Sequence, residues 1–251
     1  MRILLISDIH SNLEALQASL DAAPPHDVVV NLGDIVGYAA SPNEVTQRVR
    51  ELGGTLVRGN HDKVVAGIED VENFNPIAGL AALWNRAQLT TENMEWLKAL
   101  PQGPITLTEL PGIQFVHGSP EDEDRYVVNI QDALPPLIES DASLTFFGHT
   151  HVQGAFLLRG GFAESMHPEY SSIGQSETSD LQLETGTHYM LNPGSVGQPR
   201  DGDWRAAFAV FDSETRVVTF CRVPYDVRSA QERIIAANLP ARLATRLAAG
   251  R

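Results

Sequence analysis

Short apolar runs recur along the chain, and each one stops at a glycine or a polar residue. Five of them span residues 3–6, 28–32, 55–57, 113–116 and 144–147. Aliphatic runs of this length, ended in this way, are typical of β-strands that are covered on both faces. The pattern therefore predicts a set of buried strands, as found in α/β proteins.

Helical patterns separate the first three of these runs. Leucines recur at helical spacing over residues 13–20. Ser11 and Glu14 stand three residues apart at the start of this stretch, which predicts a capping box, and residues 41–44 predict a second one with proline in the first turn. Strand, helix, strand, helix and strand within about sixty residues predict a parallel βαβαβ unit.

Beyond this unit the pattern changes twice. Residues 70–101 predict two helices, and residues 73–75 are candidates to border a site. From residue 105 the chain is rich in strand-like runs, which predict a second, mixed sheet packed on the first. The polar stretch 160–186 predicts a long mobile loop. Residues 226–250 predict one or two terminal helices.

Composition narrows the class of protein. The chain has 251 residues and a formal net charge of −14, so nothing suggests electrostatic attraction to nucleic acid or to an anionic membrane. Residues 121–124 are all acidic and predict a solvated loop; if the loop faces the site instead, it would disfavour polyanions such as nucleic acid. No secretory signal or long apolar span is evident, and we expect a cytoplasmic protein without membrane attachment. We expect residues 1–251 to form a single domain.

The residues that end the five strand-like runs are polar in a consistent way. In parallel α/β sheets, ligands gather at the carboxyl ends of the strands. Five of the eight histidines fall at these ends, together with two aspartates and one asparagine, which predicts a metal site with two ions. The sequences are Asp8-Ile9-His10, Gly33-Asp34, Gly59-Asn60-His61-Asp62, His117-Gly118 and Gly148-His149-Thr150-His151.

The spacing of these residues suits chelation. Asp8 and His10 are two apart in an extended chain, so both side chains point the same way and can hold one cation. Asp34 is a carboxylate that can bridge two ions, and Asn60 offers a neutral carbonyl oxygen. Oxygen and imidazole ligands without thiolate favour manganese here, with Fe, Zn, Ni or Mg as alternatives.

Two dications about 3.5–4 Å apart clamp a phosphoryl group and lower the pKa of a bridging water, which gives hydroxide near neutrality. The leaving oxygen then needs a proton. His61 lies next to Asn60 and is our candidate donor, with Asp62 placed to orient or charge it. No nucleophilic serine or cysteine motif, P-loop or dinucleotide-binding motif competes with this interpretation.

Taken together, the five motifs resemble the calcineurin-like metallophosphoesterase family, in the same order and over most of the chain. The resemblance implies a four-layer α/β/β/α sandwich of two mixed sheets flanked by helices. It assigns one metal ion to Asp8, His10, Asp34 and His151. It assigns the other to Asp34, Asn60, His117 and His149, with His61 as proton donor or transition-state stabiliser.

The segment 192–200 is similar to the compact bacterial and archaeal branch of this family, which includes diadenosine tetraphosphatase-like proteins and broad phosphodiesterases. Its glycine amides and Arg200 suit a loop next to phosphate, and a tight structural turn is an equal alternative. Asn60, His61 and Arg200 are the candidate substrate-binding residues. Asp34 is not followed by the Asp-Arg extension of the protein serine/threonine phosphatases, which argues against a phosphoprotein substrate.

The leading hypothesis is therefore a dinuclear metal-dependent hydrolase, a phosphodiesterase or phosphatase. It would cleave a phosphodiester, a phosphomonoester or a nucleotide pyrophosphate bond through a metal-bridging hydroxide. We expect a small phosphate ester or a nucleotide as substrate. The alternative is a non-catalytic scaffold that uses the same fold for protein–protein contacts. A nuclease subunit is a third hypothesis, which the acidic charge and the absence of a basic stripe argue against.

Overall fold

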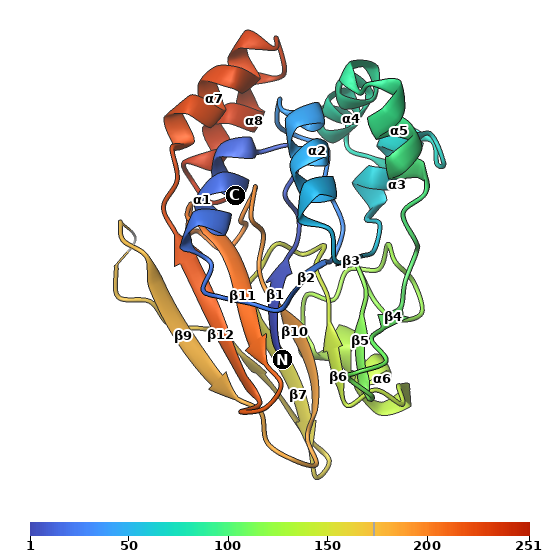
Figure 1. The fold of residues 1–251 in the computed structure, drawn as a ribbon, viewed down its shortest axis with the longest axis vertical. Coiled ribbons are helices and arrows are strands. Elements are labelled where there is room, and N and C mark those ends of the chain that lie inside the picture. Colours follow the sequence, from blue (N-terminus) through green and yellow to red (C-terminus); the bar gives the residue numbers. More distant parts are fainter. Residues whose placement is uncertain (173) are drawn as a thin grey trace.

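Two six-stranded sheets form the centre of the molecule (Figure 1). The computed structural model describes residues 1–172 and 174–251. The first sheet has the order β3-β2-β1-β11-β12-β9. Its strands are β1 (Arg2–Ile6), β2 (Val28–Asn31), β3 (Thr55–Leu56), β9 (Glu177–Gln182), β11 (Ala206–Asp212) and β12 (Val217–Val223). The pairs β1–β2 and β2–β3 are parallel, which confirms the predicted βαβαβ unit, and the other three pairs are antiparallel.

The second sheet has the order β4-β5-β6-β10-β7-β8. Its strands are β4 (Ile105–Thr106), β5 (Ile113–Phe115), β6 (Leu144–Phe146), β7 (Gly154–Arg159), β8 (Phe162–Met166) and β10 (His188–Asn192). β5–β6 and β6–β10 are parallel pairs, and the others are antiparallel. The predicted second mixed sheet is thus confirmed.

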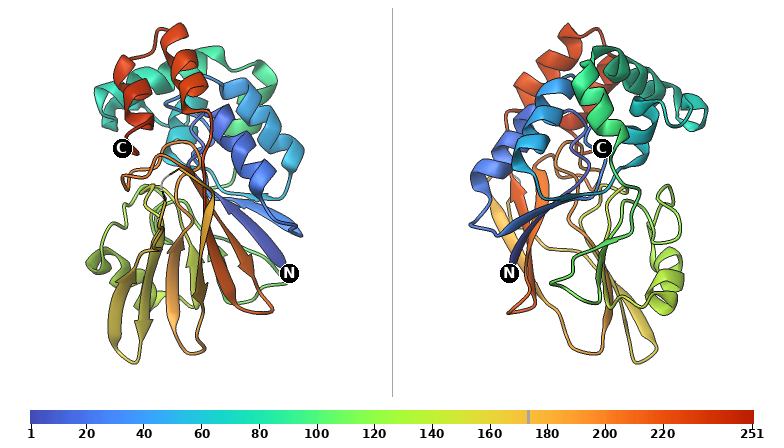
Figure 2. Two further views of the ribbon diagram at one scale, coloured as in Figure 1. Left: turned by 90° about the vertical axis from the view of Figure 1, so that its left-hand side faces the viewer. Right: turned by 45° about the vertical axis from the view of Figure 1, so that its right-hand side comes forward.

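Helices cover the outer face of each sheet. α1 contacts β11 and β12 of the first sheet, whereas α6 contacts β7, β8 and β10 of the second. Figure 2 shows α1 and α6 on opposite sides of the sheet pair, so the layers follow the order α/β/β/α that the family resemblance implied. The helices are α1 (Leu13–Ala22), α2 (Pro42–Leu52), α3 (Asn60–Ala66), α4 (Pro76–Gln88), α5 (Thr91–Lys98), α6 (Ile130–Glu139), α7 (Val227–Ala236) and α8 (Ala241–Leu247), with a short 3₁₀ turn η1 (Val71–Asn73).

β1 shows why the predicted strands carry apolar residues at every position. Ile3 and Leu5 point into the core between the two sheets, and Leu4 and Ile6 point into the core beneath the helices. All four side chains are 0–1% exposed. Each such burial contributes about 1.5–3 kcal/mol, so a strand with two apolar faces is fixed in register on both sides.

The predicted capping boxes are wrong in detail. Asn12, not Ser11, is the N-cap of α1, and its side chain accepts a hydrogen bond from the amide of Ala15. Ser11 lies at a φ of +56° and donates its hydroxyl to Asn85, because the chain has not yet turned into the helix. Ser41 is the N-cap of α2, but its side chain makes no capping hydrogen bond.

Residues 160–186, predicted to be a mobile loop, contain strands β8 and β9. Residue 173 lies outside the described residues. β8 and β9 are edge strands. Burial alternates along β9 because side chains on one face of this strand point toward the protein and those on the other face point to solvent. Polar composition is compatible with such a strand, which explains why the sequence pattern was misleading.

α6 was not predicted, and two prolines inside it account for this. Pro135 and Pro136 argue against a helix in any pattern analysis. The helix begins after Asn129, whose side chain accepts hydrogen bonds from the amides of Gln131 and Asp132, and it buries Ala133 and Leu137. Among the described residues, no helix is long and apolar enough to cross a membrane.

Candidate metal centre

The loops that follow β1, β2, β5 and β6 meet at one end of the sheet pair, together with the first turn of α3. Backbone hydrogen bonds lock these loops to one another. The amide of Asp8 donates to the carbonyl of Gly33 at 2.9 Å, and the amide of Gly148 donates to the carbonyl of His117 at 2.8 Å. The amide of His149 donates to the Asp8 carboxylate at 3.1 Å and so joins the ends of the two sheets, and the polar residues that follow the strands lie close together.

We call Asp8, His10, Asp34 and His151 the first ligand group. One donor atom from each of these residues lies within 4.8 Å of the others, and all four residues are buried. His10 Nε2 is 3.5 Å from Asp34 Oδ2, and His151 Nε2 is 3.3 Å from Asp8 Oδ1. The two histidine Nε2 atoms are 3.1 Å apart. This group contains the four residues that the resemblance assigned to one ion.

We call Asp34, Asn60, His117 and His149 the second ligand group. Donor atoms of Asp34, His117 and His149 lie within 4.8 Å of one another. Asn60 Oδ1 is 3.4 Å from His117 Nε2, which is itself 3.5 Å from Asp34 Oδ2. The same Asp34 oxygen is thus 3.5 Å from a histidine nitrogen of each group.

Backbone carbonyls fix the orientation of the histidine rings. The Nδ1–H groups of His10, His117 and His151 donate to the carbonyls of Val36, Leu32 and Gln198, at 3.1, 2.7 and 2.6 Å. A carbonyl can only accept, so Nδ1 carries a proton in each of these rings and Nε2 faces the site. His149 is reversed: its Nε2–H donates to the carbonyl of Asp124 at 3.0 Å, which leaves Nδ1 as the donor atom for a metal.

Burial controls the protonation of the first ligand group. It lowers the pKa values of His10 and His151 well below the usual range, so both rings are neutral and able to ligate. Burial also raises the pKa of Asp8 to about 7. Burial alone would raise the pKa of Asp34, but the positive charge and the hydrogen bond of His117 outweigh it and hold that pKa well below its ordinary value.

His117 in the second ligand group behaves in the opposite way. Burial opposes its charged form, but the Asp34 carboxylate outweighs burial and raises the pKa of His117 to about 10. Burial lowers the pKa of His149 to about 3. Without a metal ion, therefore, His117 and Asp34 form an ion pair, and His149 is neutral.

The backbone is strained where the ligands lie. Nine described residues other than glycine have a positive φ, and five of these belong to the two ligand groups. Each costs about 1 kcal/mol or more, and strain of this kind gathers at functional sites. The five are Asp8, His10, Asp34, His149 and His151, with φ values of 52°, 51°, 55°, 67° and 60°.

Two glycines leave room for the key side chains. At Gly37, where φ is +106°, an added Cβ would lie 2.5 Å from Nδ1 of His61. At Gly59, an added Cβ would collide with the Asp34 carboxylate. Both positions require glycine because a site residue occupies the space of a side chain.

His61 lies in the first turn of α3 and is 4% exposed. Its ring centroid is 4.4 Å from that of Tyr38, 4.5 Å from Phe74 and 4.7 Å from His10. Its Nδ1 has no hydrogen-bond partner among the described residues. Burial lowers the pKa of His61 to about 4, although Asp34 acts in the opposite direction, so the ring is neutral at pH 7.

Asp62 does not contact the His61 ring in the way predicted for an orienting residue. Its carboxylate accepts hydrogen bonds from the amides of Ile35, Val36 and Gly59, at 2.9, 3.2 and 3.0 Å. The observed contacts stabilise the loop after β2 and the start of α3. Because Asp62 is buried, its pKa is raised to about 7.

The segment 192–200 supports the ligands from behind. The amide of Gly197 and the hydroxyl of Ser195 both donate to the carbonyl of Asp8, at 3.0 and 2.7 Å. The amide of Gly194 donates a hydrogen bond to Oδ1 of Asn192 at 2.8 Å. The glycine amides are thus not free to face an anion, and the structural-turn alternative holds for this part. Arg200 differs, because its Nη2 donates to the Tyr38 hydroxyl at 3.1 Å.

A cavity of about 330 Å³ opens beside the second ligand group. Asn60, His61 and His149 form its floor. The ring of Tyr126 stacks on His149 with centroids 3.7 Å apart. The remaining lining residues are Tyr38, Glu69, Asn73, Phe74, Asn75, Ala78 and Asp124. Residues 73–75 therefore do border the site, as the sequence suggested.

Tyr38 and Tyr126 line this cavity and were not predicted from the sequence, whereas Asp124 brings the acidic loop to the site, which was the alternative to a solvated loop. The loop 121–124, expected to be solvated, is partly buried. Glu123 is 8% exposed and pairs with Arg58 at 2.9 Å and with Lys63 at 3.2 Å. A run of four acids gives no sign that Arg58, after β3, and Lys63, on α3, will pair with one of them, so this arrangement could not be predicted from the sequence.

Comparisons with known proteins agree with this geometry. The chain is 35% identical, over 99% of its length and 98% of the relative, to an uncharacterized protein of Methanocaldococcus jannaschii. It is similar to the crystal structure of a metallophosphoesterase from Sphaerobacter thermophilus, with 39% identity, a TM-score of 0.84 and coverage of 100% of this chain and 99% of the other. A hypothetical protein from Pyrococcus horikoshii shares the fold at 21% identity, with a TM-score of 0.77 and coverage of 100% and 98%. Residues 1–216 match the model of the calcineurin-like phosphoesterase superfamily domain, and the chain belongs to that superfamily.

Proposed function

We propose that this protein is a phosphoesterase that uses two divalent metal ions. The observation that carries the proposal is the position of Asp34 Oδ2, which lies 3.5 Å from the ligating nitrogen of His10 and 3.5 Å from that of His117. One oxygen shared by two sets of buried ligands is the arrangement that a bridging carboxylate needs. Two adjacent metal ions are common in enzymes that displace a group from phosphorus.

The residues fit divalent cations. Each of the four histidines in the two groups donates one ring N–H to a backbone carbonyl and presents the other nitrogen to the site. Carboxylate, amide and imidazole donors without thiolate suit manganese, our first candidate, and also Fe, Zn, Ni and Mg. When bound, the two ions would polarise the phosphoryl oxygens and supply a water-derived nucleophile near neutral pH.

We assign to His61 the donation of a proton to the leaving group. It belongs to neither ligand group, and its ring lies on the floor of the cavity next to Asn60. The neutral ring can donate an N–H hydrogen bond to a phosphate oxygen, and a nearby phosphate anion would favour the protonated form. We assign substrate contacts to Asn60, which lines the cavity, and to Arg200, which donates a hydrogen bond to the cavity residue Tyr38. Asp62 is assigned a positioning role through the backbone of the loop after β2.

The cavity favours a small phosphate ester or a nucleotide. Tyr38, Phe74 and Tyr126 provide aromatic surface for an organic group, and Glu69 and Asp124 place carboxylates at the rim. Those carboxylates, together with the net charge of −14, disfavour a long polyanion such as nucleic acid. The leaving group is therefore expected to be compact and partly apolar.

The decisive experiment removes metal with a chelator and restores Mn²⁺, Ni²⁺, Zn²⁺ or Mg²⁺ singly. Hydrolysis of a chromogenic phosphodiester and of the matching monoester is measured each time. We expect activity that disappears with the chelator and returns with one metal, and the ratio of the two substrates then defines the bond that is cleaved. Binding of two ions without hydrolysis of any phosphate ester would contradict the proposal and favour the non-catalytic scaffold.

A further inference from the structure

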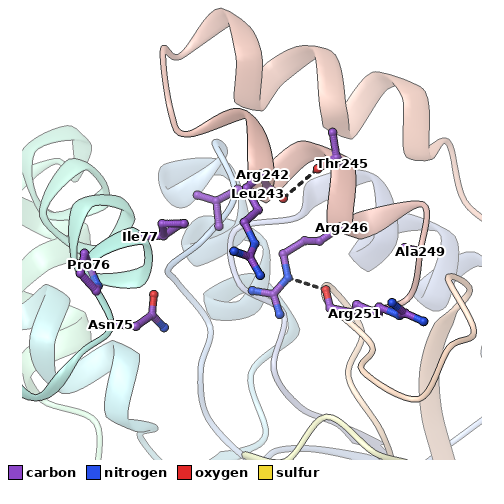
Figure 3. Close-up of a pocket in the computed structure, with 9 residues that line it drawn as sticks. All are labelled: Asn75, Pro76, Ile77, Arg242, Leu243, Thr245, Arg246, Ala249 and Arg251. Carbon is purple, nitrogen blue, oxygen red and sulfur yellow. Dashed lines mark hydrogen bonds between the residues drawn. The ribbon is translucent and has the colours of Figure 1, made fainter.

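A second cavity, of about 800 Å³, lies between the start of α4 and helix α8 (Figure 3). Its apolar surface comes from Pro76 and Ile77 on α4 and from Leu243 on α8. Arg242 and Arg246, one turn apart on α8, supply its charge. α8 follows the part of the chain that matches the superfamily model, which ends at residue 216, so the match assigns no role to this cavity.

The two arginines turn toward the same space. In Figure 3 the guanidinium groups of Arg242 and Arg246 lie near each other and face Asn75 and Ile77, whereas the side chain of Arg251 points away. The main-chain oxygen of Arg251 accepts a hydrogen bond from Nε of Arg246 and so holds that side chain in place. Like charges one helical turn apart repel each other, so this pair opposes folding unless an anion joins it.

These arginines also have no Asp or Glu partner among the described residues. In the described part of the chain, nine arginines and both lysines form ion pairs with Asp or Glu side chains. Arg200, Arg242 and Arg246 are not among them. Arg86, Arg125, Arg216 and Arg251 also form no such pair among the described residues, but Arg200, Arg242 and Arg246 are the ones that gather around Tyr38 and the cavity beside α8. Three of them close together therefore mark a place for an external anion.

This cavity is next to the one over the second ligand group. Asn75 lines both. The ring of Tyr38 lies between them: its centroid is 4.4 Å from that of His61, 5.5 Å from Cζ of Arg246 and 5.7 Å from Cζ of Arg200. A ligand that reaches from one cavity to the other therefore has to pass only one side chain.

We propose that the cavity beside α8 binds a second phosphate group of the substrate. The inference rests on the proposed function, because the first phosphate is the one held at the metal ligands and cleaved there. Planar guanidinium groups pair well with phosphate oxygens, and the wall of Pro76, Ile77 and Leu243 suits the apolar part of a sugar or a base. The substrate class is thus a small organic ester with two separate phosphate groups, such as a phosphorylated nucleotide ester.

Two chromogenic probes test this proposal on the metal-loaded protein. One is the p-nitrophenyl ester of thymidine 5′-phosphate, and the other is the same ester with an additional 3′-phosphate. We expect kcat/KM to be higher for the second probe, and the ratio between the probes to fall on the order of fivefold in Arg242→Gln. Arg228→Gln is the matched control, because it removes the same charge from the neighbouring helix α7, outside either cavity.

A ratio that is the same in the wild type, Arg242→Gln and Arg228→Gln would overturn the proposal. If neither probe is hydrolysed, the proposed function fails. A binding measurement then tests the phosphate site in the cavity independently of catalysis. Isothermal titration of thymidine 3′,5′-bisphosphate into the metal-free protein is expected to give a Kd that Arg242→Gln weakens on the order of fivefold and Arg228→Gln does not. No binding, or equal binding by all three proteins, would refute the phosphate site.

Discussion

The two ligand groups share Asp34 but differ in what surrounds them. The first group is closed: Asp8, His10, Asp34 and His151 are 0–1% exposed, and backbone hydrogen bonds from buried loops hold them. The second group is open on one side, because Asn60 and His149 form part of the cavity floor. His149 is held by the carbonyl of Asp124, from the loop before α6, and by the exposed ring of Tyr126.

This difference indicates that the two ligand groups have separate roles within one site. On the proposed function, we expect the closed group to exchange its ion slowly and to fix the geometry, and the open group to receive the phosphate ester. Protonation follows the same division. The histidines of the first group are neutral, whereas His117 of the second group carries a proton that an incoming ion must displace.

The largest effect is expected at the residue that joins the two groups. Asp34→Asn removes the negative charge that the two proposed ions would share. It keeps a side-chain oxygen that can accept the hydrogen bond from the amide of His61, which Asp34 Oδ1 accepts at 2.8 Å in this structure. We expect loss of at least one ion and a fall in kcat of at least about 10³-fold, since metal ions stabilise transition-state charge by several kcal/mol. Metal content by mass spectrometry and turnover of the best ester measure both effects.

Asp180→Asn is the control for this variant. Asp180 is exposed on β9 and accepts a hydrogen bond from Thr219, so the same change of charge is made far from the ligands. Thermal unfolding of both variants without metal checks that the fold is kept. An Asp34→Asn protein that binds two ions and keeps wild-type turnover would show that Asp34 does not link the groups.

His61 touches both groups without belonging to either, so His61→Ala separates catalysis from metal binding. We expect metal content to stay at the wild-type level and kcat to fall about 10²–10⁴-fold for an ester with a poor leaving group. The fall is expected to be much smaller for a p-nitrophenyl ester, because p-nitrophenolate leaves without a proton. Equal losses on both kinds of substrate would remove the leaving-group role from His61.

The sequence predicted the ligands better than their surroundings, and the reason is physical. The ligands other than Asn60 lie within five residues of the end of a buried strand, and a strand with apolar residues on both faces can be recognised from local pattern alone. The carboxyl ends of parallel strands lie at the same edge of a sheet, so residues far apart in the sequence could be expected to meet. Asp8 and Asp34 are examples, with β1 and β2 paired in parallel.

The positions of the other residues around the site depend on long-range contacts, which no local sequence pattern reveals. Tyr126 lines the site because the loop before α6 folds back over His149, and Asp62 binds backbone amides of a loop 27 residues earlier. Arg242, Arg246 and Asn75 line one cavity only because α8 lies across from the start of α4, which neither helix reveals by itself. Long-range packing between irregular segments decides each of these positions.

Proton release distinguishes the second group from the first. At pH 8.5 the Asp8 carboxyl, with a pKa of about 7, is already ionised, whereas His117, with a pKa of about 10, still holds its proton. Binding of the ion at the second group is expected to release about one proton, so its apparent affinity rises about tenfold per pH unit until the pH approaches the pKa of His117. Calorimetric titrations in two buffers with different enthalpies of ionisation measure this release. Identical heats in both buffers would contradict the ion pair between His117 and Asp34.

The smallest effect is expected from the open side of the second group. Tyr126→Ala removes the ring that stacks on His149 at 3.7 Å and an interplanar angle of 27°. An aromatic pair contributes about 0.5–1.5 kcal/mol, so we expect the affinity for the second ion to fall about threefold to tenfold while that for the first ion is unchanged. Competition with a fluorescent chelator resolves the two dissociation constants, and Tyr126→Phe, which keeps the ring, is the matched variant and is expected to bind like the wild type. If Tyr126→Ala weakened both ions equally, the two groups would not be independent, and the division between a closed and an open group would have to be abandoned.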